Sequence, residues 1–397
     1  MEKKKSIFSY YKPYKKIFFA DMFFAIMASI ITLVIPLVVR YITSTVIYYE
    51  TDEAFRVILK LGLMMTVLIL FQCYCNYFIA NYGHVMGAKI EYDMRAEIFA
   101  HYQKLPFSFY DNQKVGQLLS RITSDLFDIT ELLHHGPENV VISAMKFIGA
   151  FVILFTISPK LTFAAFALIP FMFLYAWFFN RKMKKAFARN RVKIADINAQ
   201  IEDNLSGIRV VKSFANESVE EEKFKGGNDG FLAAKKDSYL YMGGYHSGLT
   251  AFINMITVIV LVTGGILITK AQVSVTDLVT FLLYISIMTD PVRTMIDFAE
   301  MFQNGYSGYE RFQEILAIEP DIQDSQGSEE LTDVKGTIDF ENVSFQYEEN
   351  TEKVLSHIDL HVDAGEYLAL VGSSGAGKTT LCNLIPRFYD VTGGSIK

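Results

Sequence analysis

Long apolar stretches alternate with polar, charge-rich stretches over the first three quarters of the chain. Each apolar stretch approaches the roughly 20 residues that an α-helix needs to cross the hydrocarbon core of a bilayer. Six stretches qualify, at about residues 17–39, 61–80, 140–158, 161–180, 247–269 and 275–298. The pattern therefore predicts an α-helical membrane protein with six spans.

The polar stretches between these spans differ in length and in charge. The second and third spans, and the fourth and fifth, are separated by roughly sixty residues with heptad-like patterns, which predict helices that continue beyond the bilayer. Six lysines precede the first span, and seven basic residues lie at 181–193, just after the fourth. Because basic residues gather on the cytoplasmic side, the N-terminus and both long connections are expected there. An even number of spans places the C-terminal segment there too.

Composition supports a membrane protein and argues against a secreted, disulfide-rich protein. Hydrophobic residues make up 51% of the 397 residues, more than a soluble domain usually carries. The apolar run at 17–39 is too long for the core of a signal peptide. The three cysteines do not form the framework of a disulfide-rich secreted protein, so we expect reduced, inert thiols. No nucleic-acid partner is expected.

A carboxylate and three prolines interrupt the spans. Asp290 lies in the sixth span, where a charge is costly unless it faces water or a partner. It either lines a substrate cavity and favours cationic substrates, or pairs with Arg293 or with a basic residue of another helix. Each proline removes a backbone hydrogen bond, so kinks are expected in three spans. These prolines are Pro36, Pro170 and Pro291.

Other polar residues near the spans receive less specific interpretations. Asp21 is expected at the cytoplasmic interface. His134 and His135 adjoin Gly136 and Pro137 just before the third span, and no third histidine or cysteine is near them in the sequence. A solvated turn is therefore the favoured interpretation over a metal site.

A phosphate-binding loop follows the membrane segments. The sequence GSSGAGKT at 372–379 fits the pattern G-x-x-x-x-G-K-[ST]. Its glycines let successive backbone N–H groups point at phosphate oxygens, Lys378 brings a positive charge, and the Thr379 hydroxyl is placed to ligate Mg²⁺. The flanking sequences GEYLALVG and KTTLCNLI predict a buried strand before the loop and a helix after it. Two further strands are predicted in GTIDFENVSFQY, which ends at Tyr347, and in KVLSHIDLHV.

Taken together, these features resemble the exporter class of ABC transporters, in particular bacterial half-transporters that export drugs or lipids. The likeness rests on the six spans, FENVSFQY, VGSSGAGKTT and LIPRFYDVTGGSI. It also includes FYDNQKVGQLLSRITSD and SGIRVVKSFANE in the long connections, and GYERFQEILAIEPDI after the last span. It implies a six-helix transmembrane domain with long cytoplasmic helices at 1–316, a linker at 317–335, and the N-terminal part of an α/β P-loop NTPase domain at 336–397.

The resemblance also implies partners and site residues. Two such chains, identical or related, would form a dimer in the cytoplasmic membrane and export a hydrophobic or amphipathic drug, lipid or peptide with ATP and Mg²⁺. Short helices near 110–116 and 215–220 would touch the nucleotide domains. Lys378 and Thr379 would act in catalysis, and Tyr347 would stack on adenine. The nucleotide contacts would come from Gly372, Ser373, Ser374, Gly375, Ala376, Gly377, Lys378, Thr379 and Thr380.

The family's signature loop, its catalytic glutamate strand and its switch histidine have no counterpart in the residues up to Lys397. We therefore expect the domain from residue 336 to be partial, and hydrolysis to belong to the intact protein. An alternative interpretation is a membrane scaffold that binds ATP without hydrolysing it, or an inactive fragment. The substrate and the choice between homodimer and heterodimer stay open.

Overall fold

The protein consists of two compact units with different secondary structure. The computed structural model describes residues 5–111, 113–320, 322, 332–347 and 353–397. One unit, here called the helical unit, comprises Tyr10–Ala88 and Thr130–Asn304; the other, the mixed unit, comprises Met1–Ser9, Lys89–Ile129 and Gly305–Lys397. The predicted linker at 317–335 includes residues 321 and 323–331, which lie outside the described residues, so these domain limits stay a prediction.

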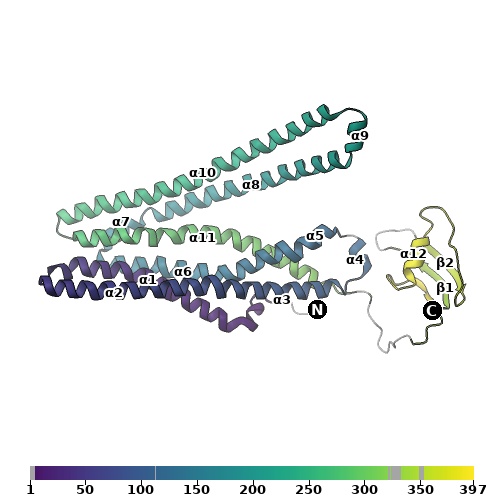
Figure 1. The fold of residues 1–397 in the computed structure, drawn as a ribbon, viewed down its shortest axis with the longest axis horizontal. Coiled ribbons are helices and arrows are strands. Elements are labelled where there is room, and N and C mark those ends of the chain that lie inside the picture. The colour runs from purple at the N-terminus through teal and green to yellow at the C-terminus, as the bar shows by residue number, and fades with distance from the viewer. Residues whose placement is uncertain (1–4, 112, 321, 323–331, 348–352) are drawn as a thin grey trace. The chain divides into compact units, whose positions relative to one another are not determined.

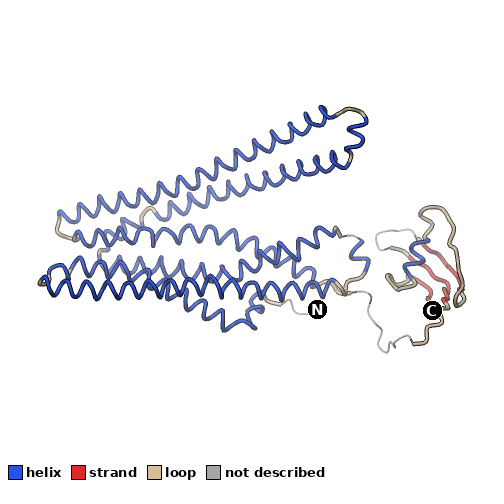
Figure 2. Tube along the Cα trace, in the orientation of Figure 1, coloured by secondary structure: helices blue, strands red, loops and turns tan. Residues whose placement is uncertain are grey.

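Helices dominate the chain, and strands are few, as Figure 2 shows; all strands follow α11 in sequence. The elements are η1 (Ile7–Tyr14), α1 (Lys15–Ser44), η2 (Val46–Tyr48), α2 (Thr51–Phe78), η3 (Ile79–Gly83), α3 (His84–Tyr102), α4 (Phe107–Asp111), α5 (Val115–Ser120), η4 (Arg121–Asp125), α6 (Leu126–Ile157), α7 (Pro159–Phe166), α8 (Ile169–Ser206), α9 (Ile208–Ser213), α10 (Glu217–Thr269), α11 (Val275–Leu316), β1 (Ile338–Phe345), β2 (Leu355–Val362), α12 (Lys378–Leu384) and β3 (Gly393–Ile396).

Six helical stretches among the described residues are long and apolar enough to cross a membrane. Each contains one of the six predicted spans to within a residue, so the protein is a multi-pass membrane protein as predicted. The helices also extend well past the apolar segments: α8 has 38 residues and α10 has 53. These two helices form a long antiparallel hairpin with α9 at its tip (Figure 1).

The core of the helical unit joins the first and the last membrane helix of the chain, α1 and α11. Phe281 and Tyr284 of α11 are almost fully buried, and the Tyr284 hydroxyl donates a hydrogen bond to the Leu33 carbonyl of α1. At the end of the same helix pair, the Arg40 guanidinium lies 2.6 Å from the Asp277 carboxylate. Contacts between residues so far apart in sequence fix α1 against α11.

The structure differs from the prediction at Pro170 and at the pair His134 and His135. Pro36 and Pro291 lie inside continuous helices, whereas Pro170 lies in the first turn of α8, after a break at 167–168. In a first turn the missing N–H of proline has no intrahelical acceptor to lose. The solvated turn predicted at His134 and His135 is wrong, because both residues belong to α6 and His134 is only 3% exposed. Gly136 and Pro137 lie inside the same continuous helix.

The mixed unit contains a three-stranded antiparallel sheet in the order β2-β1-β3. Phe340, Val343 and Phe345 of β1 pack with Leu381 and Leu384 of α12 to form its small core. The strands β1 and β2 and the helix α12 are confirmed predictions; β3 was not predicted. The strand predicted in GEYLALVG is wrong: residues 366–372 form no strand and are exposed. No strand among the described residues pairs with this segment, so its backbone groups remain open to water.

Candidate functional site

The phosphate loop owes its shape to two glycines in the left-handed region. Gly375 has φ +85° and Gly377 has φ +83°, conformations that side chains with a Cβ rarely adopt. Gly377 also directly precedes α12 and packs tightly, because a Cβ there would lie 2.9 Å from Leu355 Cδ2 and 3.1 Å from the Val354 carbonyl. The glycines therefore both curl the loop and seat it against the start of β2.

Lys378 brings its charge back over the loop that precedes it. Its Nζ donates hydrogen bonds to the carbonyls of Gly372, at 2.9 Å, and of Ser373, at 2.7 Å. These carbonyls fix the ammonium group at the mouth of the loop. An anion cradled by the loop would meet this charge directly.

The two threonines after Lys378 have different environments. Thr379 is exposed at the beginning of α12, so its hydroxyl is accessible to a cation. Thr380 is only 7% exposed, and its Oγ1 lies 3.1 Å from the Tyr347 hydroxyl. This arrangement fits the Mg²⁺-ligand role expected for Thr379 and a packing role for the Thr380 side chain.

Tyr347 belongs to a group of aromatic rings beside α12. Its ring packs edge-on against Phe345, with centroids 4.8 Å apart, and against Tyr389, with centroids 5.3 Å apart. The predicted site residues from Tyr347 to Thr380 therefore lie around one helix. Stacking of Tyr347 on adenine stays a prediction.

The segment after α12 contacts the short helix α4 within the mixed unit. The rings of Phe107 and Phe388 are stacked with centroids 4.1 Å apart, and the Tyr389 hydroxyl donates to Asp111 Oδ2 at 2.6 Å. Burial, and then the neighbouring Asp111 carboxylate, raise the pKa of Tyr389 above its usual value. Sequence reasoning missed Phe388 and Tyr389, because nothing in the local pattern indicates which helix they meet.

The two short helices expected near 110–116 and 215–220 are offset from those ranges. The first connection contains two short helices, α4 at Phe107–Asp111 and α5 at Val115–Ser120, and the second contains α9, at Ile208–Ser213. Residue 112 lies outside the described residues. The first expected range therefore overlaps the end of α4 and the start of α5, whereas α9 ends before the second range begins.

Asp290 is far from the phosphate loop in sequence and lies in the helical unit. Its side chain is exposed, and it lines a small pocket with Arg293, Met172 and Leu249. Among the described residues, no ion pair within 4.0 Å joins Asp290 to Arg293 or to any other basic side chain. The intrahelical pair that was one of the alternatives is therefore not formed here, and a role in a substrate cavity stays a prediction.

Comparison with known proteins gives matches along nearly the whole chain. Residues 18–292 match the family model of the ABC transporter transmembrane region, and residues 355–397 match the model described as ABC transporter. A Bacillus subtilis protein described as an uncharacterized ABC transporter ATP-binding protein, YwjA, is 38% identical over 392 residues, which cover 99% of this chain and 68% of the relative.

Two further relatives carry names that mention export. The putative multidrug export ATP-binding/permease protein YgaD of Bacillus subtilis is 28% identical over 399 residues, covering 99% of this chain and 68% of the relative. A Staphylococcus aureus protein described in the same words is 29% identical over 396 residues, with the same two shares. With its six apolar helices, its phosphate loop and these matches, the chain belongs to the ABC transporter family, as an exporter-type half-transporter.

Proposed function

We propose that this chain exports a hydrophobic or amphipathic substrate, such as a drug, lipid or peptide, across the cytoplasmic membrane at the expense of ATP. The proposal rests on how one chain connects its membrane helices to its phosphate loop. One chain holds six membrane helices and a phosphate loop, and the segment following that loop contacts α4, which lies between the second and third spans. Nucleotide binding at the loop can therefore act on the membrane helices.

The chemistry at the loop would be positioning and charge neutralisation. The backbone N–H groups at 374–380 would hold the phosphates, Lys378 would face the β- and γ-phosphates, and the exposed Thr379 hydroxyl would ligate Mg²⁺. Lys378 is already held at the loop by the carbonyls of Gly372 and Ser373. In this proposal, the remaining groups needed for hydrolysis belong to the intact protein and to a second half-transporter chain, identical or related.

The two short helices would transmit closure of the nucleotide domains to the membrane. At α4 the contact consists of the Phe107–Phe388 stack and the Tyr389–Asp111 hydrogen bond. Around α9 three apolar side chains face solvent: Leu205 is 64% exposed, Val210 is 61% and Phe214 is 73%. Such an exposed apolar patch suits contact with another protein surface, and we propose that this surface belongs to a nucleotide domain. ATP must bind one arrangement of the helices better than the other for transport to follow.

The distribution of charge supports the proposed orientation, and the names of two relatives support the proposed substrate class. Basic residues precede the first span and follow the fourth, which supports a cytoplasmic position for the N-terminus and for the phosphate loop. Asp290, exposed on α11, would favour substrates that carry a positive charge. The names of two relatives mention multidrug export, which agrees with a hydrophobic or amphipathic substrate.

The test is ATP-driven transport by the intact protein in proteoliposomes. Lys378→Ala removes the charge at the loop and should abolish Mg·ATP-dependent uptake of an amphipathic dye. Lys335→Ala is the matched control, because this lysine is also exposed in the mixed unit and lies outside the loop. Undiminished transport by Lys378→Ala would refute the role of the loop. ATP binding without any hydrolysis by the intact protein would favour the rival function, a membrane scaffold that senses ATP.

A further inference from the structure

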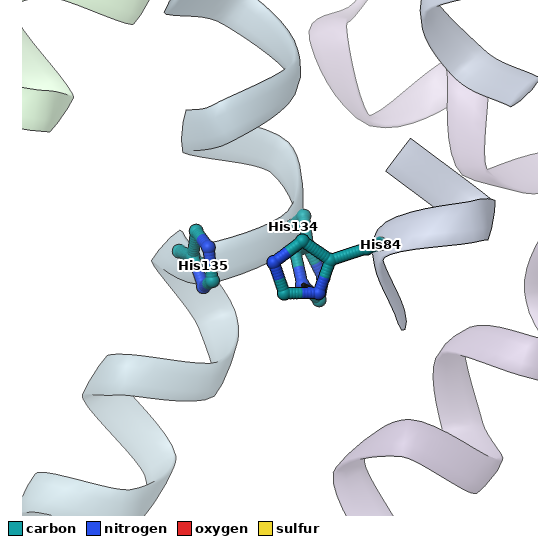
Figure 3. Close-up of side chains that lie close together, drawn as sticks. All are labelled: His84, His134 and His135. Carbon is teal, nitrogen blue, oxygen red and sulfur yellow. Dashed lines mark hydrogen bonds between the residues drawn. The ribbon is translucent and has the colours of Figure 1, made fainter. Parts of the chain in front are cut away.

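Five side chains able to ligate a metal ion gather in the helical unit, outside the phosphate loop. They form two overlapping groups that share His134 of α6: one adds His84, at the start of α3, and His135, and the other adds Asp21 of α1 and Glu138. We call these five residues the histidine cluster. Figure 3 shows the three imidazoles close together, His84 approaching from one helix and the other two from α6. Their ring centroids lie 4.3 to 5.0 Å apart.

The distances in the histidine cluster suit a small metal ion. Ligand atoms at 2.0–2.1 Å from a tetrahedral zinc ion are separated from one another by about 3.3 Å. His134 Nε2 lies 3.1 Å from His84 Nδ1 and 3.9 Å from Glu138 Oε2. Glu138 Oε2 in turn lies 3.3 Å from His135 Nδ1. These separations bracket the tetrahedral value, and the ligand atoms of the three histidines all lie within 4.8 Å of one another.

Buried polar atoms without partners provide an independent indication of a ligand. Both carboxylate oxygens of Asp21 and the Nδ1 atom of His134 are buried and have no hydrogen-bond partner among the described residues. The two residues are 0% and 3% exposed. A buried carboxylate in this state is costly. A bound cation would offset its charge, and metal-ligating histidines commonly donate their second ring N–H to a carboxylate.

The helix that carries His84 leaves room for His134. Gly83 closes the π-helical turn η3 directly before His84, and such turns are frequent at functional sites. A Cβ at Gly83 would lie 2.9 Å from Asp21 Oδ1 and 3.1 Å from His134 Nδ1, closer than ordinary contact. One turn later, a Cβ at Gly87 would lie 3.5 Å from His134 Cβ. Two glycines on one helix face thus admit the buried imidazole.

All members of the histidine cluster lie at the same end of the apolar segments. Asp21 is near the start of the first segment, His84 follows the end of the second, and His134 precedes the start of the third. This is the end that faces the long connections. His84 is exposed and the other two imidazoles are not, so an ion can reach the cluster from the surface at His84.

We propose that the histidine cluster binds one divalent transition-metal ion of the zinc class. The ligands are the imidazoles of His84, His134 and His135 and the carboxylate of Glu138, and Asp21 accepts the second ring N–H of His134. Imidazole and carboxylate ligands suit Zn²⁺, Co²⁺ and Ni²⁺, whereas Mg²⁺ and Ca²⁺ prefer all-oxygen sites. The ion links α1, α3 and α6 at one end of the bundle, independently of the function proposed for the phosphate loop.

Cobalt provides a direct test, because tetrahedral Co²⁺ absorbs strongly in the visible range. The full chain, purified in detergent through a tag without histidine, should bind one Co²⁺ per chain with such a spectrum, and Zn²⁺ should displace it. His134→Gln should abolish the spectrum, and His84→Gln should weaken Co²⁺ binding by more than about tenfold. His246→Gln, on α10 outside the cluster, is the matched control and should bind as the unmodified chain does.

The exposed position of His84 keeps the test decisive if His134→Gln misfolds. Removing an exposed imidazole leaves no buried cavity, so His84→Gln is expected to keep the elution volume and thermal midpoint of the metal-free chain. A folded His84→Gln chain with undiminished Co²⁺ affinity would overturn the proposal. So would a weak six-coordinate spectrum in the unmodified chain, or thiolate-to-cobalt absorption that identifies the cysteines as the ligands.

Discussion

The phosphate loop and the histidine cluster are sites of opposite construction. The loop is contiguous: eight residues at 372–379 contain its glycines, its lysine and its threonine. The histidine cluster draws on three separate segments, with Asp21 and Glu138 more than a hundred residues apart. A contiguous site is visible in the sequence because its backbone geometry demands particular residues at fixed spacing. A dispersed site appears only when packing brings helices together, as His134 and His84 show.

The largest expected effect separates the two neighbouring threonines of the loop. Thr379→Ala removes the exposed hydroxyl and should lower Mg²⁺-dependent ATP turnover of the intact protein by about 10²-fold or more. Thr380→Ala removes the buried hydroxyl beside Tyr347 and should cost about 1 kcal/mol of stability with little change in Mg²⁺ dependence. Mg²⁺ titrations of turnover distinguish the two. Equal loss of Mg²⁺ dependence in both variants would contradict this assignment.

A second prediction concerns the glycines of the loop. Alanine at Gly377 suffers both an unfavourable φ of +83° and contacts with Leu355 and Val354, so we expect a loss of about 2 kcal/mol or more. Alanine at Gly375 suffers only the unfavourable φ, since a Cβ there meets nothing within 4 Å, and should cost about 1 kcal/mol. Urea denaturation followed by hydrogen exchange of β1 amides measures both losses. A larger loss at Gly375 would refute the packing role of Gly377.

The corresponding glycine of the histidine cluster gives a third prediction. A methyl group at Gly83 overlaps the His134 imidazole, so Gly83→Ala should lower the stability of the helical unit by about 1–3 kcal/mol and weaken Co²⁺ binding. Gly62→Ala on the preceding helix α2 is the control: a Cβ there meets nothing within 4 Å, so its effect should stay within about 1 kcal/mol. Fluorescence of Trp177, the single tryptophan, reports the thermal midpoint. Matching midpoints for both variants would argue against close packing at the cluster.

The smallest expected effect lies in the sheet beside the loop. Hydrogen bonds to Asp339 and then to Asp363 raise the pKa of the His361 imidazole. The charged ring therefore favours the folded sheet; this contribution is complete below the unfolded pKa of about 6.5 and is lost as the pH rises through the higher folded value. His361 is well exposed, so the change is small. Exchange protection of β1 and β2 amides should fall slightly between pH 6 and pH 8, and His361→Gln should remove that difference.

The sequence predicted the membrane region well because lipid restricts the choice of structure. Six apolar stretches of spanning length left little freedom, and all six are helical. The predicted strands at β1 and β2 and the helix α12 were also confirmed. Exact positions depended on tertiary contacts and were less predictable: the two short helices α4 and α9 begin several residues before their expected ranges.

Two errors have a common physical origin in contacts that local patterns do not encode. Residues 366–372 have the apolar composition of a buried strand but lack a pairing partner among the described residues. His134 looked solvated because its neighbours Gly136 and Pro137 are typical of turns, yet α6 continues through them and buries the ring. The interface position predicted for Asp21 stays a prediction, but its imidazole neighbour from α6, more than a hundred residues away, could not be read from the sequence.

One distance measurement tests the coupling between nucleotide and helices most directly. Spin labels at Val115 on α5 and Val210 on α9, both exposed, would be introduced into the intact protein without its native cysteines and diluted with unlabelled chains. We predict that trapping with Mg·ATP and vanadate shifts the distance distribution between the two labels, and that Lys378→Ala abolishes the shift. A distribution that stays the same with and without the trapped nucleotide would contradict the proposal that the phosphate loop drives the membrane helices.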